Sequence, residues 1–393
     1  MINYLNFSKE KFFQIILYII FLIFFFKIFF YTFDWIIAFK AALIDKADKI
    51  FWDFEVYYCA IQNLILDNDP YKSVYTCSPS HKDFYFPYPP LTLNFFKPFS
   101  YLNFFNAKLA WGFLSISIFF YSFLCLNRIL KTRFSLILYF LIIIFSLDKT
   151  VIYSFFTGNV SFILFNLLII GFYQFINKRE FLFYFIVVFI SLFKIYFLIY
   201  LFFPILLREK NSFFYVSSSI FFIFSIYFFD WIYEKDYFLS YIYSFQTTLG
   251  GTEHGLSGIG ILNLFQKTLD KFSYSDIQIL LAAYLFFVGI ILYFFFIFTK
   301  KLIFNKERII FSSIVLFLLS ILLPRLVIYE TILIVPLILY LVENLEKFYT
   351  KKNANIIFLF FFGFFLLNGD SSLIFLFLIL TFLIIFLPAW RNW

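Results

Sequence analysis

Long apolar runs recur along the whole chain and constrain its fold more than any other feature. The first run, residues 12–33, follows Lys9 and Lys11 and is long enough to cross the roughly 30 Å hydrocarbon core of a bilayer. It contains no small-residue cleavage site, so we interpret it as a retained membrane anchor. Further runs lie near residues 105–127, 134–147, 155–176, 181–193, 195–207, 212–229, 277–299, 309–323, 331–342, 356–367 and 373–387.

Composition supports a membrane environment. Apolar residues make up 63% of the chain and charged residues only 14%, with a mean hydropathy of +0.92, which is far from the usual mix of a soluble domain. No repeat of 20 to 50 residues is evident. We therefore predict an all-α, polytopic transmembrane bundle of about 12 spans that forms a single domain over residues 1–393.

Basic residues predict the orientation of this bundle. The net charge of +8 is gathered in short clusters between apolar runs, which indicates membrane topology and not a nucleic-acid partner. These clusters are expected in the cytoplasm: Arg128, Lys131 and Arg133; Lys178 and Arg179; Arg208 and Lys210; Lys300, Lys301, Lys306 and Arg308; Lys347, Lys351 and Lys352. The alternate loops, including two large ones near residues 34–104 and 230–276, should then face outward. This alternation requires residues 181–207 to form two short helices that meet near Lys194.

Motifs of soluble enzymes and metal sites are missing from the sequence. It has no P-loop, no nucleotide-binding glycine fingerprint, no HExxH and no GxSxG. Only His81 and His254 occur, which excludes a histidine-rich metal site, and we expect neither a metal nor a cofactor. Cys59 and Cys77 share the first outward loop and could pair in an oxidising compartment, but the spacing leaves this open, and Cys125 lies within a span.

The first outward loop contains a helix-compatible segment that starts near residue 51 and stops before Asp69. On this helix Asp53 shares a face with Val56, Tyr57, Ala60 and Leu64. A carboxylate on such a face needs a partner or a task, unless Asp53 simply caps the helix or interacts with its dipole. Glu55 should project elsewhere, toward water.

At this point the sequence resembles glycosyltransferase family 87, one of the GT-C membrane glycosyltransferases. The resemblance lies in DFEVYYCA at residues 53–60, DPY at 69–71, FPYPPL at 86–91 and Pro98. Weaker matches are GNVS at residues 158–161 and FKIYF at 193–197. The segment 324–330 stands where the family usually has polar or histidine residues before a tyrosine, and here it has no histidine.

The resemblance implies a multi-pass enzyme of the plasma (inner) membrane with an outward or periplasmic active site. It would transfer a hexose, often mannose, from a polyprenyl-phosphate-linked donor to a glycolipid or polysaccharide acceptor. Such a displacement needs a base on the acceptor hydroxyl and positive charge on the departing phosphate. Asp53 is the candidate base of an inverting reaction, and Lys194 and Arg325 are the candidate phosphate partners.

Alternatives apply to each of these residues. Lys194 could snorkel to the interface, and Arg325 could pair with Glu330. Further candidates for binding acceptor or other substrate are Tyr57, Tyr88, Asn159 and His254, the last within a glycine-rich segment that could equally be a flexible connection.

Two other functions stay open, namely a transporter or lipid flippase and a non-catalytic subunit of an envelope polysaccharide assembly system. A transporter should place ionisable residues at mid-membrane on broken helices, whereas this chain gathers them in outward loops. That distribution favours the enzyme.

Overall fold

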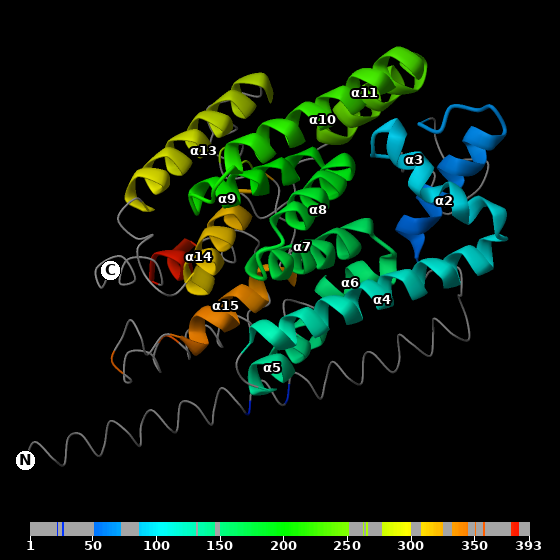
Figure 1. Ribbon diagram of the computed structural model, residues 1–393. Helices are drawn as coiled ribbons and strands as arrows, with labels where there is room; N and C mark the ends of the chain where they lie inside the picture. The colour runs from blue at the N-terminus through cyan, green and yellow to red at the C-terminus, as the bar shows by residue number, and fades with distance from the viewer. Residues whose placement is uncertain are drawn as a thin grey trace, which may run out of the picture.

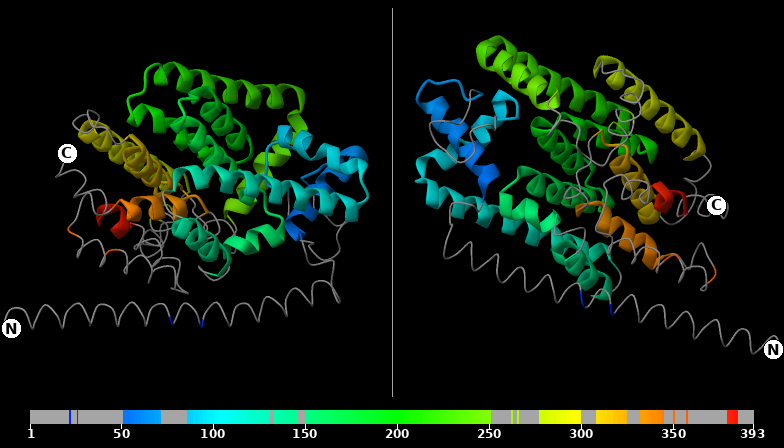
Figure 2. Two further views of the ribbon diagram at one scale, coloured as in Figure 1. Left: turned by 60° about the horizontal axis from the view of Figure 1, so that its bottom comes forward. Right: turned by 180° about the vertical axis from the view of Figure 1, so that it is seen from behind.

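A computed structural model describes residues 51–71, 86–130, 133–145, 150–250, 277–299, 308–324, 332–344 and 379–384, together with residues 22, 26, 262, 265, 350 and 357. Every regular element within these ranges is a helix, which confirms the predicted all-α class. Figure 1 and Figure 2 show the helices as one group, with α2 and α3 at one side and α13 at the opposite side.

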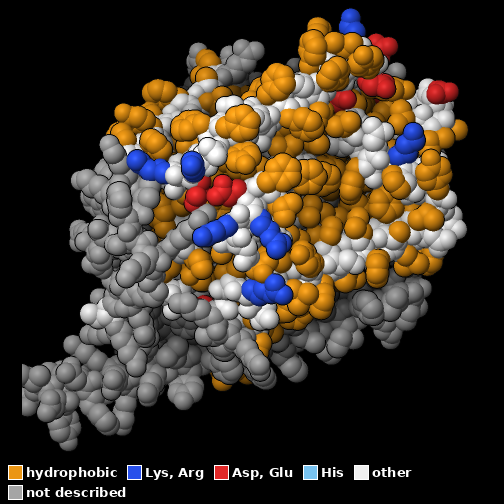
Figure 3. All heavy atoms as spheres, in the orientation of Figure 1, with side chains coloured by type: hydrophobic (Ala, Val, Ile, Leu, Met, Phe, Trp, Pro, Cys, Tyr) orange, Lys and Arg blue, Asp and Glu red, His pale blue; other side chains and the backbone are white. Residues whose placement is uncertain are grey.

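Three of these helices are long and apolar enough to cross a membrane: α4 (Phe104–Ile129), α10 (Ser212–Tyr233) and α13 (Ile277–Thr299). Only 33%, 22% and 28% of their respective most apolar windows is buried inside the protein, so most of their apolar surface is left for lipid. Figure 3 shows hydrophobic side chains over most of one face, with Lys and Arg in small groups between them. The structure supports a membrane protein, but three candidates do not establish a count of twelve spans.

Shorter apolar helices fill the interior. Helix α7 (Val160–Ile176) packs between α4 and α8 (Glu180–Phe193), and most of its residues are buried. Helices α5 (Arg133–Phe145) and α6 (Thr150–Thr157) precede it in the chain. At 1.5 Å rise per residue α7 spans about 25 Å, which is slightly less than the hydrocarbon core. Its burial makes it an internal helix, and of the three long helices α4 packs directly against it.

The predicted break at Lys194 is confirmed. Helix α8 ends at Phe193, Lys194 is extended with φ −136° and ψ 98°, and the 3-10 helix η4 (Ile195–Leu201) then leads into α9 (Phe202–Leu206). The two apolar segments on either side of Lys194 pack against each other. The chain thus reverses direction at this lysine.

The region predicted as the first outward loop, residues 34–104, is largely helical where it is described. Helix α2 (Trp52–Ile65) forms close to its predicted bounds. Helix α3 (Pro90–Phe96) begins with a proline, which suits a first helical position because that position needs no N–H donor. The 3-10 helix η2 (Lys97–Tyr101) leads from α3 toward α4. Elements α2 and η2 pack against α4, and α3 meets it where the Phe96 ring contacts Trp111.

Aromatic packing holds α2 and α3 against α4. The fully buried indole of Trp111 stacks on Phe54 at a ring-centroid distance of 5.0 Å and lies 5.6 Å from Phe96.

The prediction that Glu55 faces water is wrong. Its side chain is only 7% exposed, because the face of α2 next to the predicted apolar face is also covered.

The region predicted as a second outward loop, residues 230–276, also starts as helix. Helix α10 continues to Tyr233, and α11 (Lys235–Gly250) follows after a single residue. Two further apolar helices, α14 (Arg308–Ile321) and α15 (Ile334–Glu343), pack against each other, and residues 379–384 are also helical.

Candidate functional site

Asp53 lies in the first turn of α2 but does not cap this helix. The N-cap position belongs to Phe51, which adopts left-handed backbone angles (φ 61°, ψ 41°) and has no side-chain oxygen to offer. The Asp53 carboxylate Oδ2 instead accepts a hydrogen bond of 2.9 Å from Nδ2 of Asn159, a residue 106 positions away. The capping interpretation of Asp53 is therefore wrong, whereas a favourable interaction with the helix dipole fits its place in the first turn.

The backbone around Phe51 brings these two residues together. The Phe51 amide donates to the Phe156 carbonyl at 2.7 Å, which ties the start of α2 to the end of α6. The Phe51 ring rests against Gly158, where a Cβ atom would lie 3.0 Å from the ring. Gly158 has φ +74° and its carbonyl accepts from the Trp111 indole at 3.0 Å. A glycine is required here for both the close approach and the backbone angle.

Asn159 connects Asp53 to the first turn of α7. Its side-chain oxygen accepts from the Ser161 amide at 2.9 Å, which makes Asn159 the N-cap residue of α7. The Ser161 hydroxyl in turn accepts a hydrogen bond from Nζ of Lys194. A polar chain thus runs from a carboxylate on α2, through the start of α7, to an ammonium at the end of α8.

Lys194 is half-buried at the break between α8 and η4. Besides its bond to Ser161, its ammonium lies 5.6 Å from the centre of the Tyr196 ring, within the range of a cation–π interaction. A neutral hydroxyl and an aromatic face are thus among the groups that hold this ammonium. Both are partners that an anionic ligand could join or displace.

Tyr57 lies one turn along α2 from Asp53, and Tyr88, which precedes α3, packs against it. Their hydroxyls approach to 3.3 Å, and the Tyr57 hydroxyl also accepts a long bond of 3.4 Å from the Val160 amide at the start of α7. Burial, and then the neighbouring Tyr88 and Asp53, raise the pKa of the Tyr57 hydroxyl well above its usual value of 10.0. Tyr57 therefore stays protonated, and both side chains are at most 5% exposed.

Five of the residues singled out from the sequence therefore meet in one region: Asp53, Tyr57, Tyr88, Asn159 and Lys194. The other two, His254 and Arg325, lie outside the described residues, so their predicted roles stay predictions. Cys59 is buried and disulfide-bonded, and Cys125 is a free thiol. Cys77, the proposed partner of Cys59, also lies outside the described residues.

Two further carboxylates, Asp230 and Asp69, hold the loop motifs in place, although the sequence analysis gave neither of them a role. Asp230, at the end of α10, accepts from the Leu91 amide at 3.3 Å and so caps α3, which has no side-chain cap of its own. Asp69 accepts from the Tyr71 amide at 2.9 Å and from the Ser240 hydroxyl of α11 at 2.7 Å. The only sequence signal for Asp69 was its place in an Asp-Pro-Tyr turn, and Asp230 at the end of an apolar run gave none.

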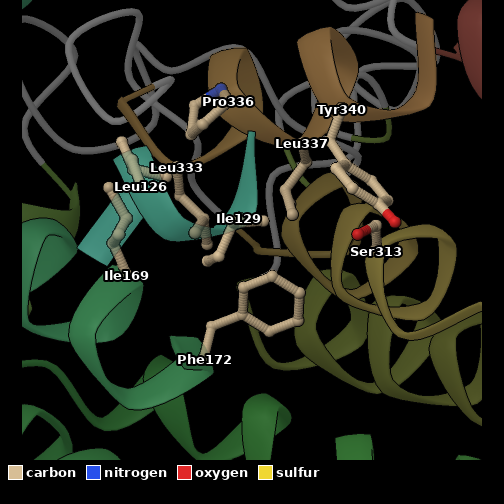
Figure 4. A pocket seen from close by; sticks show the side chains of 9 residues that line it. All are labelled: Leu126, Ile129, Ile169, Phe172, Ser313, Leu333, Pro336, Leu337 and Tyr340. Carbon is tan, nitrogen blue, oxygen red and sulfur yellow. The ribbon is translucent and has the colours of Figure 1, made fainter. Parts of the chain in front are cut away.

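An apolar pocket lies elsewhere, between α4, α7, α14 and α15 (Figure 4). Its wall includes Ile169 and Phe172, which lie about 15 Å or more along α7 from Asn159 at the rise of an α-helix. Its only side-chain oxygens belong to Ser313 and Tyr340, and it has no ionisable carboxylate or amine. The pocket therefore has no carboxylate to act as a base and no amine to balance a phosphate, and we place the candidate site at Asp53.

No group of three or more His, Cys, Asp or Glu side chains that could hold a metal ion occurs among the residues that the structure describes. The Asp53 region does contain a half-buried carboxylate, which a hydrogen bond from Asn159 orients, and the ammonium of Lys194 belongs to the same polar chain. This pairing can accept a proton at one end and balance a negative charge at the other.

Comparison with known proteins gives one match. A family model described as glycosyltransferase family 87 matches residues 86–324, which is more than half of the chain. The matched range includes the FPYPPL segment, Asn159 and Lys194, and it begins after Asp53. No curated protein and no solved structure matches the chain.

Proposed function

The chain belongs to glycosyltransferase family 87, and from this premise we propose that it transfers a mannose-like hexose from a polyprenyl-phosphate-linked donor to a glycolipid or polysaccharide acceptor. Its membership makes it a membrane glycosyltransferase, in keeping with its three long apolar helices. We propose, beyond family membership, the identity of the donor and acceptor, inversion at the anomeric carbon and an active site that faces outward.

One observation carries the proposal: the polar chain that joins Asp53 to Lys194 through Asn159 and Ser161. Sugar transfer from a glycosyl phosphate needs a proton acceptor on the nucleophile side and positive charge on the leaving-group side. Lys194 stands between two apolar segments, α8 and η4, where a phosphate attached to a lipid chain could reach it from the bilayer. Asp53 starts a helix that lies outside the candidate spans, where an acceptor hydroxyl could arrive from water.

In the proposed reaction the Asp53 carboxylate removes the proton of an acceptor hydroxyl as that oxygen attacks the anomeric carbon. The bond between the anomeric carbon and the phosphate oxygen breaks, and polyprenyl phosphate leaves as an anion. The Lys194 ammonium balances the charge that develops on this phosphate. Because the hydroxyl attacks from the face opposite the phosphate, the sugar is inverted and no second carboxylate is needed as a nucleophile.

The proposed location is the plasma (inner) membrane with Asp53 on the outer side. Trp111, which packs beneath α2, and Arg128 lie 17 residues apart on α4, or about 26 Å at the rise of an α-helix. This separation approaches the thickness of the hydrocarbon core. The basic residue at the far end of α4 therefore supports a cytoplasmic position for that end and an outward position for the Asp53 region.

The test uses purified protein, radiolabelled polyprenyl-phosphate sugars and a membrane extract as the source of acceptor. We expect the parent to form labelled product and Asp53→Asn to form about two to four orders of magnitude less, because a general base has been removed while the side-chain shape is kept. Donor binding should change little, since it depends on the phosphate and the lipid.

Asp67→Asn is the matched control. It makes the same chemical change beyond the other end of α2, where Asp67 is exposed and left-handed (φ 55°), a conformation that asparagine tolerates. This variant should retain parental activity. Absence of transfer from every donor would overturn the enzymatic proposal, and Asp53→Asn activity within a few-fold of the parent would remove Asp53 from the role of base. A chain that binds donor without transferring sugar would instead favour the non-catalytic subunit.

A further inference from the structure

The Asn159 side chain is held at both ends of its amide group. Its oxygen accepts from the Ser161 amide at 2.9 Å, and its nitrogen donates to the Asp53 carboxylate at 2.9 Å. From this arrangement we propose that Asn159 is a positioning residue that orients the Asp53 carboxylate and keeps it charged, and not a residue that binds the acceptor. The inference rests on the proposed function, in which Asp53 is the base.

The amide can take only one orientation between these partners. Rotating it by half a turn would place its oxygen against the Asp53 carboxylate and its N–H group against the Ser161 N–H, so both hydrogen bonds would become repulsive contacts. The cap of α7 therefore decides which atom faces Asp53. Because α7 uses the side-chain oxygen of Asn159 at its N-cap, the N–H group of the same side chain faces the Asp53 carboxylate.

The backbone of Asn159 is fixed as well. Its own amide donates to the Ser154 carbonyl at 3.0 Å, and its carbonyl accepts from Phe162 at 3.1 Å. The preceding residue, Gly158, is pinned by the Trp111 indole. A half-buried side chain on such a backbone has little freedom to move toward a ligand, which suits a positioning role.

The bond from Asn159 affects the base in two ways. It fixes the direction of the carboxylate, and it stabilises the ionised form, because an N–H donor binds a carboxylate more strongly than a neutral carboxylic acid. The ionised form is the one that can remove a proton from a hydroxyl. Loss of this donor should therefore make Asp53 hold its proton up to a higher pH.

Other titratable groups near this network stay unchanged in the test. Tyr57 interacts electrostatically with Asp53 and contacts Tyr88, while Lys194 lies beyond Ser161. The remaining ionisable side chains described on α2 near Asp53 and on the elements packed against it include Glu55, Lys97 and Lys108. Because these groups are the same in the parent and in the Asn159 variants, a difference between their pH profiles reports on the change at Asn159.

Asn159→Ser separates positioning from capping. Serine caps a helix about as well as asparagine, but its short side chain cannot also reach Asp53. We expect the acid limb of the pH dependence of kcat/KM to move up by roughly one unit, which corresponds to a tenfold change in proton affinity. The kcat at the plateau should fall by about tenfold and the donor KM by less than threefold, because only the base has been disturbed.

Asn103→Ser is the matched control, since Asn103 caps α4 by accepting from the Asn106 amide at 2.9 Å and is exposed. Its pH profile should equal that of the parent. If Asn159→Ser does not fold, Asn159→Asp keeps the size and the capping oxygen while placing a second carboxylate against Asp53. That variant should move the acid limb further upward than serine does.

The outcomes separate this inference from the proposed function. If the parent transfers sugar and Asp53→Asn does not, but both Asn159 variants keep the parental acid limb, then Asn159 is only a cap and the inference is overturned. If the parent transfers no sugar, the proposed function itself has failed. An upward shift of the limb in Asn159→Ser, absent in Asn103→Ser, supports the positioning role.

Discussion

Replacing Lys194 by methionine tests the leaving-group side of the reaction. Methionine has nearly the same length but no charge, so it removes the bond from Nζ to the Ser161 hydroxyl and the contact with the Tyr196 ring. A hydrogen bond from a charged group contributes about 1.5–3 kcal/mol, and a cation–π contact contributes about 0.5–1 kcal/mol at an exposed site and about 2 kcal/mol at a desolvated one. The variant also no longer has to desolvate an ammonium at a half-buried site, which offsets part of this loss. We therefore expect a change in unfolding free energy of about 1 kcal/mol.

The expected loss of activity is larger. An ammonium about 4 Å from a phosphate contributes about 4 kcal/mol at an effective dielectric constant near 20. Since each 1.4 kcal/mol is a factor of ten, kcat/KM for the donor should fall by roughly 10²- to 10³-fold in Lys194→Met. Lys194→Arg should retain part of the activity, because it keeps the charge with a different geometry.

The assay measures initial rates of transfer over a range of polyprenyl-phosphate-sugar concentrations, with folded protein quantified in parallel. Lys97→Met is the matched control, because Lys97 is an exposed lysine on η2. Ser161→Ala removes the hydroxyl that accepts from Lys194 but leaves the charge of the lysine, and it should lose far less activity than Lys194→Met. Equal activity of Lys194→Met and the parent at every donor concentration would refute the phosphate role and favour snorkelling of Lys194 to the interface.

Two further predictions follow from the same region and from the topology. Gly158→Ala should lower the thermal midpoint and the transfer rate, because the residue has φ +74° and the new Cβ would lie 3.0 Å from both Phe51 and Phe54, whereas Gly289→Ala, with nothing within 4 Å, should do neither. In intact cells an impermeant thiol reagent should label a cysteine at position 67 and not one at position 210, since Arg208 and Lys210 form a basic cluster. The opposite labelling pattern would reverse the proposed orientation.

Several features of this protein were determined by local sequence alone. Apolar length and composition indicated a helical membrane protein, and the structure confirmed the helical class and three helices of sufficient length. The bounds of α2 and the break at Lys194 were also predicted, because helix starts and stops depend on residues within one or two turns. The family resemblance came from short motifs, and the match over residues 86–324 confirmed it.

The tertiary structure alone decided what each polar side chain contacts. Asp53 was expected to cap α2 or to interact with its dipole if it had no other task, but a left-handed Phe51 holds the N-cap position and the Asp53 carboxylate meets Asn159 instead. Glu55 was expected in water and is buried, and Asp230 caps a helix that starts 140 positions earlier in the chain. Local periodicity specifies which face of a helix is apolar, but a hydrogen bond between distant residues depends on how helices pack against one another, and no short stretch of sequence encodes that geometry.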